Sequence, residues 1–261
     1  MIKCDFSNAK NLNTGDRVVL GSESLLPLGS NHLRISGATR KLQAGCELVC
    51  EGRSVFKILS AFWAESVPGA KLWVAEVSEM APESGEHELE VKKEGYSLAY
   101  ITLSDKGAVG EREDKAGPLI AEMIKNALPS VLIQGYLIPD ECNELKALIM
   151  HLAHVSRFDL ILTTGGTGVG PRDVSPEATM SVIDKRLPGF ERAITAVGME
   201  KTPHAMISRA VAGTIGESVV VNFPGSPKAV KESLEAVIPA LKHTIDKLQG
   251  DKSDCATLFV K

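Results

Sequence analysis

The segment LTTGGTGVGPRDVSPEAT, residues 162–179, places four glycines directly after an apolar run. A tight turn needs only one or two glycines, whereas a longer run exposes successive backbone N–H groups that form a concave anion site. A helix is expected to follow, with Ser175 as its N-cap and Pro176 at its first position, and a helix N-terminus adds positive potential. The segment matches neither the Walker loop nor the dinucleotide pattern G-x-G-x-x-G. It therefore indicates a phosphate-handling loop of another kind, and the competing interpretation is a plain turn.

Two carboxylates could act beside this loop. Asp140 directly precedes a predicted helix, so its competing interpretation is a helix N-cap. Asp173 could equally be a turn residue or the ion-pair partner of Arg172. Because Mg²⁺ takes one or two carboxylates together with substrate phosphates, Asp140 and Asp173 are a candidate magnesium site. His151 and His154 are three residues apart and could also chelate a metal, but a polar helix face is the better interpretation.

Apolar runs alternate with helical periodicity from residue 96 onward. The runs are 97–103, 130–138, 158–164 and 217–223, and the helical stretches are 117–128, 141–155, 175–187 and a long one that begins at Ser226 and Pro227. This alternation predicts an α/β fold with a mostly parallel sheet and helices on both faces. The loops that follow the strands then meet at one edge, where such sheets bind ligands. All four loops combine Gly or Pro with Asp, Ser, Lys or Arg, so the glycine loop and both carboxylates are expected at this edge.

The first 95 residues have a different pattern. Short apolar stretches between Gly and polar breaks predict a small β-rich domain over residues 1–80. The polar, charged segment 81–95 is interpreted as a linker. Residues 96–250 then form the α/β domain, and 251–261 form a C-terminal tail.

Composition excludes several functional classes. The net charge of −4, from 29 basic and 33 acidic residues, argues against a non-specific nucleic-acid binder. No apolar run approaches the ~20 residues of a membrane span, and the N-terminus lacks the apolar region of a secretory signal, so a cytoplasmic protein without a membrane partner is expected. The scattered cysteines favour reduced thiols over a zinc site; they are Cys4, Cys46, Cys50, Cys142 and Cys255.

Several segments together carry a family resemblance. The segment TTGGTGVGPRDVSPEAT resembles the signature of the molybdopterin adenylyltransferases, the family of MogA and the gephyrin G domain. TLSDKG, EDKAGP, LIPDE, LPGFERAI, ISRAVAG and VNFPGSPKAVKESLE resemble further segments of that family, in family order over about residues 97–250. Residues 1–95 lie outside the resemblance, so it gives no role for them.

The resemblance implies a molybdopterin-binding fold and a reaction in which ATP adenylylates molybdopterin and pyrophosphate is released. It implies that Asp140 and Asp173 are the catalytic pair, which we assign to Mg²⁺ and to positioning of the co-substrate ATP. The implied substrate and nucleotide shell comprises Ser104, Asp105, Asp114, Thr164, Gly165, Gly166, Thr167, Gly168, Arg172, Ser208, Arg209, Pro224, Gly225 and Ser226. Lys106, Lys115 and Lys228 also lie in the four loops, where a triphosphate needs counter-charge.

The resemblance also suggests a homotrimer and other proteins of molybdenum cofactor biosynthesis as partners. Two alternatives remain open beside the enzyme. One is a scaffold module of the same pathway that keeps the pterin site without turnover, and the other is a CinA-type nucleotide hydrolase, which the GGTGVG signature disfavours. Retention of both aspartates with intact loops favours the adenylyltransferase.

Overall fold

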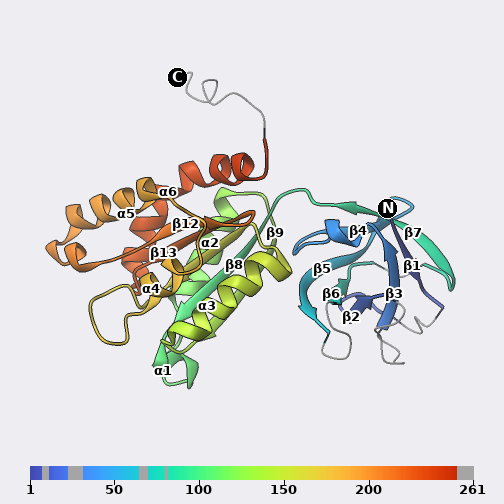
Figure 1. Cartoon of the computed structure of the whole chain (residues 1–261), viewed down its shortest axis with the longest axis horizontal. Coiled ribbons are helices and arrows are strands. Elements are labelled where there is room, and N and C mark those ends of the chain that lie inside the picture. Colours follow the sequence, from blue (N-terminus) through green and yellow to red (C-terminus); the bar gives the residue numbers. More distant parts are fainter. Residues whose placement is uncertain (8–11, 23–31, 65–69, 80–81, 252–261) are drawn as a thin grey trace. The chain divides into compact units, whose positions relative to one another are not determined.

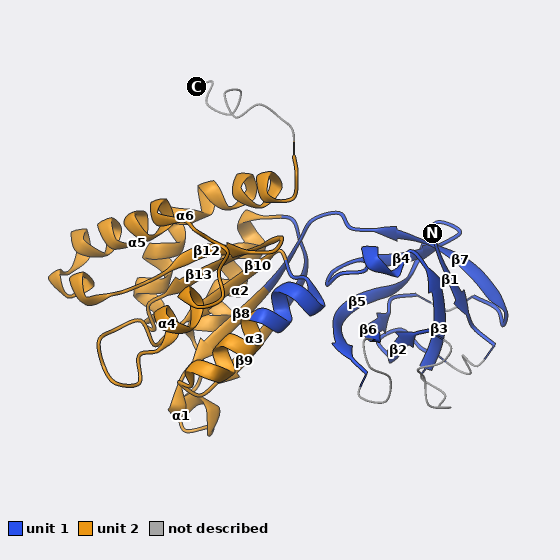
Figure 2. Ribbon diagram, viewed as in Figure 1, with its two compact units in different colours: residues 1–98, 129–134, 150–158 blue, residues 99–128, 135–149, 159–261 orange. Residues whose placement is uncertain are grey.

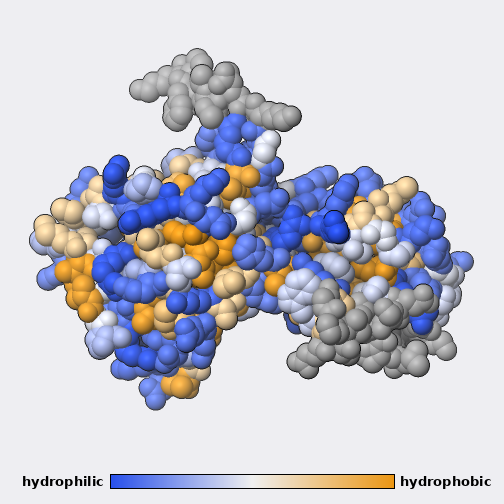
Figure 3. Space-filling model, in the orientation of Figure 1, coloured by the Kyte–Doolittle hydropathy of each residue, from blue (hydrophilic) through white to orange (hydrophobic). Residues whose placement is uncertain are grey.

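The chain forms two compact units in a computed structural model that describes residues 1–7, 12–22, 32–64, 70–79 and 82–251 (Figure 2). Unit 1 comprises residues 1–98, 129–134 and 150–158, and unit 2 comprises residues 99–128, 135–149 and 159–261. Of the expected tail, only Asp251 lies within the described residues. No helix in the described ranges is both long and apolar enough to cross a membrane. On the face shown in Figure 3, hydrophobic residues are interspersed with hydrophilic ones.

Unit 1 contains a closed β-barrel, which confirms the expected β-rich N-terminal region. Around the barrel the strands follow the order β1-β3-β2-β6-β5-β4-β7, and β7 pairs with β1 to close it (Figure 1). Alternate residues of each strand point inward, so Trp73, Ala75 and Val77 of one strand all belong to the barrel core. The strands are β1 (Ile2–Asp5), β2 (Arg17–Gly21), β3 (His32–Gly37), β4 (Glu47–Cys50), β5 (Arg53–Trp63), β6 (Lys71–Val77) and β7 (Glu86–Lys92), and a 3-10 turn, η1 (Thr39–Lys41), follows β3.

The predicted linker needs correction, because residues 86–92 of segment 81–95 form strand β7. This strand pairs antiparallel with β1, where Leu89 lies opposite Ile2, and with β4, where Val91 lies opposite Leu48. Leu89 is fully buried in the barrel core, whereas Glu88 and Glu90 beside it are exposed. The segment is rich in charge because only one face of the strand is buried, and its short apolar alternation is easily mistaken for a polar connector.

The predicted boundaries at residues 80 and 96 also need correction. Two later segments, 129–134 and 150–158, belong to unit 1 and contact the barrel. The Ala44 amide donates to the Ser156 carbonyl at 2.8 Å, and the Ala61 amide donates to the Ser156 hydroxyl at 3.2 Å. Such contacts join residues about a hundred positions apart in the chain, and no local pattern encodes them.

Unit 2 is built on a six-stranded sheet with the order β11-β12-β13-β10-β8-β9. The four predicted strands correspond to β8 (Tyr96–Leu103), β9 (Ser130–Ile138), β10 (Leu160–Thr164) and β13 (Ser218–Phe223), and β10 and β13 are parallel. Two short strands were not predicted, β11 (Lys185–Arg186) and β12 (Ala212–Ile215), and they add an antiparallel edge. Both are too short to show a periodic pattern, and β12 begins Ala-Gly.

Helices lie on both sides of this sheet, with α3 on one face and α2 and α6 on the other (Figure 1). The α helices are α1 (Asp105–Ala108), α2 (Ala116–Ala127), α3 (Cys142–Met150), α4 (Ser175–Met180), α5 (Pro188–Lys201) and α6 (Pro227–Leu248), and the 3-10 turn η3 (Pro203–Ile207) follows α5. The predicted helix 141–155 ends as a π-helix, η2 (His151–Ser156), which belongs to unit 1.

The two predicted N-caps have different outcomes. Ser226 caps α6 as expected, since its side chain accepts from the Ala229 amide at 3.2 Å and Pro227 is the first helical residue. Ser175 is not the N-cap of α4, because Val174 occupies that position and Ser175 lies inside the helix. Helix α4 also ends at Met180, well before the predicted residue 187.

If β7 is a core strand, Leu89→Ala should lower the free energy of unfolding by about 2–5 kcal/mol, the cost of truncating a buried leucine. Both tryptophans of the chain, Trp63 and Trp73, lie in β strands of unit 1, so denaturant unfolding followed by tryptophan fluorescence reports on the barrel. The neighbouring Glu88→Ala serves as a control and should change little. Equal midpoints for both variants would contradict the assignment of β7 to the core.

Candidate functional site

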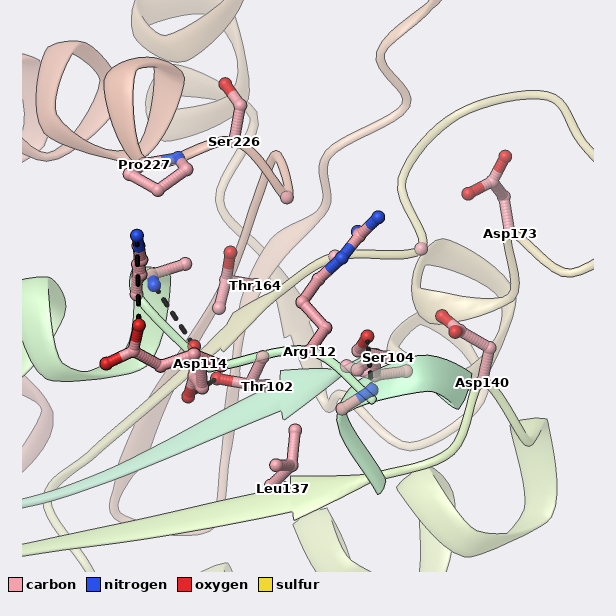
Figure 4. Close-up of a pocket in the computed structure, with 18 residues that line it drawn as sticks. Thr102, Ser104, Arg112, Asp114, Leu137, Asp140, Thr164, Asp173, Ser226 and Pro227 are labelled. Carbon is pink, nitrogen blue, oxygen red and sulfur yellow. Dashed lines mark hydrogen bonds and ion pairs between the residues drawn. The ribbon is translucent and has the colours of Figure 1, made fainter. Parts of the chain in front are cut away.

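A cavity of about 750 Å³ lies where strands β8, β9, β10 and β13 end, at the edge that the sequence predicts. It is drawn in Figure 4, where Asp114 lies at one end and Asp140 and Asp173 lie at the other. The cavity brings together predicted residues from all four loops, namely Ser104, Asp114, Asp140, Thr164, Gly165, Gly166, Asp173, Gly225 and Ser226.

Gly165 and Gly166 form a turn that only glycine permits. Gly165 has a φ of +98°, and a Cβ atom there would lie 2.4 Å from the Leu103 carbonyl oxygen. Gly166 has a φ of +61°, and its Cβ would lie 2.8 Å from the Ser175 hydroxyl oxygen. That hydroxyl donates to the Gly165 carbonyl at 2.7 Å, so the serine expected to cap α4 instead fixes the turn. The turn therefore has a structural requirement for glycine in addition to any contact with phosphate.

Asp173 is a turn residue that also lines the cavity. Its Oδ2 accepts a hydrogen bond from the Gly170 amide at 2.7 Å, and its own amide donates to the Gly170 carbonyl at 3.0 Å. A Cβ at Gly168 would lie 2.7 Å from the same carboxylate oxygen. The turn interpretation of Asp173 thus holds, while pairing with Arg172 does not, and Oδ1 accepts no hydrogen bond from the described residues.

Asp140 is coupled to the loop after β8 and does not cap the helix that follows it. Asp140 Oδ2 accepts from the Asp105 amide at 3.0 Å, and Asp105 Oδ1 accepts from the Asp140 amide at 3.0 Å. Arg172 donates to both oxygens of Asp105, at 2.7 and 3.0 Å, and to Glu141 Oε1 at 2.7 Å. This arginine therefore ties together the loops after β8, β9 and β10.

The same arrangement separates the acidities of two neighbouring aspartates. The Arg172 guanidinium lowers the pKa of the exposed Asp105 carboxyl. Burial, together with the negative charges of Asp105 and Asp173, raises the pKa of Asp140, although the Asp105 amide and Arg172 act in the opposite direction. Asp140 is thus a partly buried carboxylate whose negative charge is only partly compensated, and it would gain from a nearby cation.

Asp114 holds the opposite end of the cavity. Its carboxylate accepts from the Ala116 and Gly117 amides, each at 3.0 Å, and from the Thr102 hydroxyl at 2.7 Å (Figure 4). The first two contacts satisfy amides in the first turn of α2. Gly117 must be glycine here, because its Cβ would lie 2.5 Å from both Asp114 Oδ2 and Tyr100 Cε2.

Arg209 holds the glycine loop through backbone carbonyl groups and does not line the main cavity. It donates to the Gly168 carbonyl at 2.7 Å and to the Asp173 carbonyl at 2.9 Å, and it forms an ion pair with Glu177. All of its donors are directed at the loop or at α4, so we assign Arg209 a positioning role.

Several predicted residues do not line the main cavity. Thr167, Gly168, Ser208 and Pro224 line a separate cavity of about 220 Å³, which η3, α5 and α6 border. Asp105 and Arg172 lie in the ion network described above, and Arg209 donates to the Gly168 carbonyl of the loop. The main cavity also contains residues that the prediction of the site missed, among them Thr102, Arg112 and Leu137. Thr102 and Leu137 lie inside strands and Arg112 inside a charged loop, so no local signal distinguishes them.

The cations and metal ligands near the cavity are few. Arg112 and Lys115 line it, whereas Lys106 and Lys228 do not. Within the described ranges, no group of three or more His, Cys, Asp or Glu residues could hold a metal ion, and Cys4, Cys46, Cys50 and Cys142 form no disulfide. Any cation here would therefore draw on Asp140, Asp173 and oxygens from outside the chain.

With this geometry in place, comparison with known proteins identifies the class of the α/β unit. Residues 99–243 match the family described as "Probable molybdopterin binding domain". Among solved structures, MoaB of Thermus thermophilus, titled a molybdopterin biosynthesis enzyme, is 42% identical with a TM-score of 0.56 and covers 60% of this chain and 98% of its own. MoaB of Pyrococcus furiosus, titled a tungsten cofactor synthesizing protein, is 34% identical with a TM-score of 0.54. The match covers 60% of this chain and 99% of the Pyrococcus chain. These neighbours confirm the predicted fold class.

Curated relatives carry related names. Gephyrin of Dictyostelium discoideum is 37% identical over 177 residues, which cover 64% of this chain but only 24% of gephyrin. Molybdopterin adenylyltransferase of Helicobacter pylori strain J99 is 35% identical over 155 residues, which cover 59% of this chain and 88% of that enzyme. The chain belongs to the molybdopterin-binding domain family, as its motifs predict, and the family match begins at residue 99.

Gly165→Ala should destabilise unit 2 by about 1–3 kcal/mol or more, because it forces a strained φ and places a methyl group against the Leu103 carbonyl. The loss is measurable as an earlier helical transition in thermal unfolding by circular dichroism. Gly189→Ala is the control, since its Cβ would have no neighbour within 4 Å. A Gly165 variant as stable as the Gly189 variant would show that the turn tolerates a side chain.

The raised pKa of Asp140 predicts a pH-dependent effect of Asp140→Asn. A raised pKa means that the folded state binds this proton more tightly than the unfolded chain, so ionisation of Asp140 opposes folding. The stability of Asp140→Asn relative to the original protein should therefore rise by roughly 0.2–1 kcal/mol as the pH increases through the ordinary Asp range, near pH ~4, and beyond. Urea unfolding at several pH values without divalent cations measures this difference, and a difference that falls as the pH rises would contradict the assignment.

Proposed function

We propose that this protein acts in molybdenum cofactor biosynthesis as a molybdopterin adenylyltransferase, transferring the adenylyl group of ATP to molybdopterin with release of pyrophosphate. The observation that carries the proposal is the convergence of Asp140, Asp173 and the Gly165–Gly166 turn on one cavity. Its volume of about 750 Å³ lies within the ~300–1,000 Å³ of small-molecule sites. The names of the bacterial relatives agree with this assignment.

In this reaction the terminal phosphate of the pterin attacks the α-phosphorus of ATP. The nucleophile is already ionised, so no general base is needed, and the main difficulty is the approach of one anion to another. Arg112 and Lys115 supply positive charge at the cavity wall. Gly165 and Gly166 line the cavity, so a bound phosphate would lie beside the backbone of this turn. Positioning and charge neutralisation of this kind account for most of the acceleration in phosphoryl transfer.

The carboxylates suit a magnesium ion better than proton transfer. Asp140 and Asp173 each retain one carboxylate oxygen that accepts no hydrogen bond from the described residues. Burial raises the pKa of Asp140, and the negative charge of Asp173 contributes in the same direction. Two carboxylates with remaining ligands from phosphate and water form the usual donor set of Mg²⁺. Asp140 and Asp173 would hold the ion, which when bound neutralises charge on the phosphates. Arg172 supports this arrangement, because its guanidinium donates to both oxygens of Asp105 and not to Asp140.

The competing function is a scaffold that binds molybdopterin without turnover. Incubation of the protein with molybdopterin, ATP and Mg²⁺ distinguishes the two, because only the enzyme forms adenylylated pterin together with pyrophosphate. Release of pyrophosphate or phosphate without molybdopterin would instead indicate a nucleotide hydrolase. The homotrimer implied by the resemblance and the cytoplasmic location expected from the sequence remain predictions, and sedimentation at micromolar concentration tests the first.

Asp173→Asn should reduce the rate of pterin adenylylation by at least ~100-fold, since it removes a charge that positions the metal and nucleotide. The amide oxygen of asparagine can still accept from Gly170, so the turn is retained and pterin binding should change by no more than a few-fold. Asp184→Asn is the matched control, because Asp184 also accepts from a backbone amide, that of Gly216 at 2.7 Å, but does not line the cavity. Single-turnover rates with calorimetric binding separate the two effects, and near-normal turnover in Asp173→Asn would refute the role.

A further inference from the structure

A second cavity, of about 690 Å³, opens at one end of the barrel and belongs to no function assigned above. Inward-facing residues form its wall, including Ile35, Leu42 and Trp73, which also belong to the barrel core. Barrel mouths are frequent sites for small molecules, and the volume lies within the ~300–1,000 Å³ of such sites.

Both tryptophans of the chain border this cavity. Trp63 lies opposite Lys71 in the pairing of β5 and β6, and Ala61 lies opposite Trp73. Trp63 is 54% exposed, and it lies two residues after Ala61, which belongs to the barrel core. A large exposed indole at the rim of a concave site provides a flat surface against which a ring can stack.

The indole of Trp73 carries a donor without an acceptor. Trp73 is 6% exposed, and its Nε1 has no hydrogen-bond partner among the described residues. A buried donor without a partner costs free energy comparable to a lost hydrogen bond. An acceptor that arrives with a ligand would remove this cost.

The opening of this cavity, called the barrel mouth below, also carries positively charged side chains. Lys71 lies with its Nζ 5.7 Å from the centre of the Trp73 ring, and it forms no ion pair with a carboxylate among the described residues. Arg40 lines the same cavity, and Arg157 donates to the Arg40 carbonyl at 2.9 Å. Burial and the charge of Arg157 lower the pKa of Lys71, as expected for a half-buried cation without a counter-charge.

We propose that the barrel mouth binds a small organic anion that carries a flat heteroaromatic ring, with the anionic group beside Lys71 and Arg40 and the ring against Trp63. An anion compensates Lys71 and Arg40, which form no ion pair with a carboxylate of the described residues, and a ring covers the exposed indole. A purely apolar ligand would leave Lys71 uncompensated, and an inorganic anion would leave Trp63 uncovered. The site does not depend on the adenylylation proposed for the α/β unit.

The chain has two tryptophans and both border this cavity, so intrinsic fluorescence of the full-length protein reports on it directly. We would titrate two sources of the same chemistry, pterin-6-carboxylate and AMP, and confirm each affinity by calorimetry. At least one should produce a saturable change in tryptophan emission. Adenosine, which lacks the charge, and inorganic phosphate, which lacks the ring, should bind at least tenfold more weakly.

Lys71→Gln should weaken binding of the ring-bearing anion about tenfold or more, since it removes a charge-assisted contact. Lys3→Gln is the matched control, because it removes one charge from an exposed ion pair with Glu86 elsewhere on the barrel. Trp63→Leu, measured by calorimetry, should also weaken binding. The proposal is overturned if neither probe binds at millimolar concentration, if adenosine or phosphate binds as tightly, or if folded Lys71→Gln protein binds like Lys3→Gln.

Discussion

The candidate site depends on one constraint, the close backbone packing between the loops that follow β8, β10 and β13. A Cβ at Gly165 would lie 2.4 Å from the Leu103 carbonyl oxygen, and one at Gly225 would lie 3.3 Å from the Gly165 Cα. The Gly165 amide donates to the Phe223 carbonyl at 3.2 Å, and the Thr164 hydroxyl donates to the Pro224 carbonyl at 2.7 Å. Because side chains are excluded from this crossing, three loops reach one cavity and α4 begins immediately beside it.

Charge at this edge is distributed unequally among similar residues. Arg172 compensates Asp105 and Glu141, which are exposed, whereas Asp140 is partly buried and has only a backbone amide as its hydrogen-bond donor among the residues that the structure describes. Asp173 completes a turn with one oxygen and retains the other. The network therefore leaves two carboxylates available at one end of the cavity while Asp114 is committed to the first turn of α2 at the other end. This asymmetry gives the cavity a direction along which a long anionic substrate could align.

The two units provide cavities of similar size but opposite character. The cavity of unit 2 contains glycines and carboxylates and would recruit a cation with its substrate. The cavity of unit 1 contains two indoles and the cations Lys71 and Arg40, and it would recruit an anion directly. Unit 1 also includes residues 129–134 and 150–158, so the chain enters it three times. Cutting the chain near residue 95 would therefore remove the contacts between the barrel and the segments 129–134 and 150–158. Variants of the full chain are the sounder test of either unit.

The sequence by itself determined the α/β architecture and the edge at which the loops meet, and it placed Asp140 and Asp173 at that edge, because strand periodicity and turn glycines are local signals. The family motifs carried the same information more specifically. Only the tertiary structure decided that segment 86–92 closes a barrel, that Ser175 fixes the Gly165 turn, and that Arg172 pairs with Asp105 rather than with Asp173. It alone placed Lys71 beside two tryptophans. These outcomes depend on contacts between residues distant in the chain, whose energies are set by burial and geometry that no local pattern records.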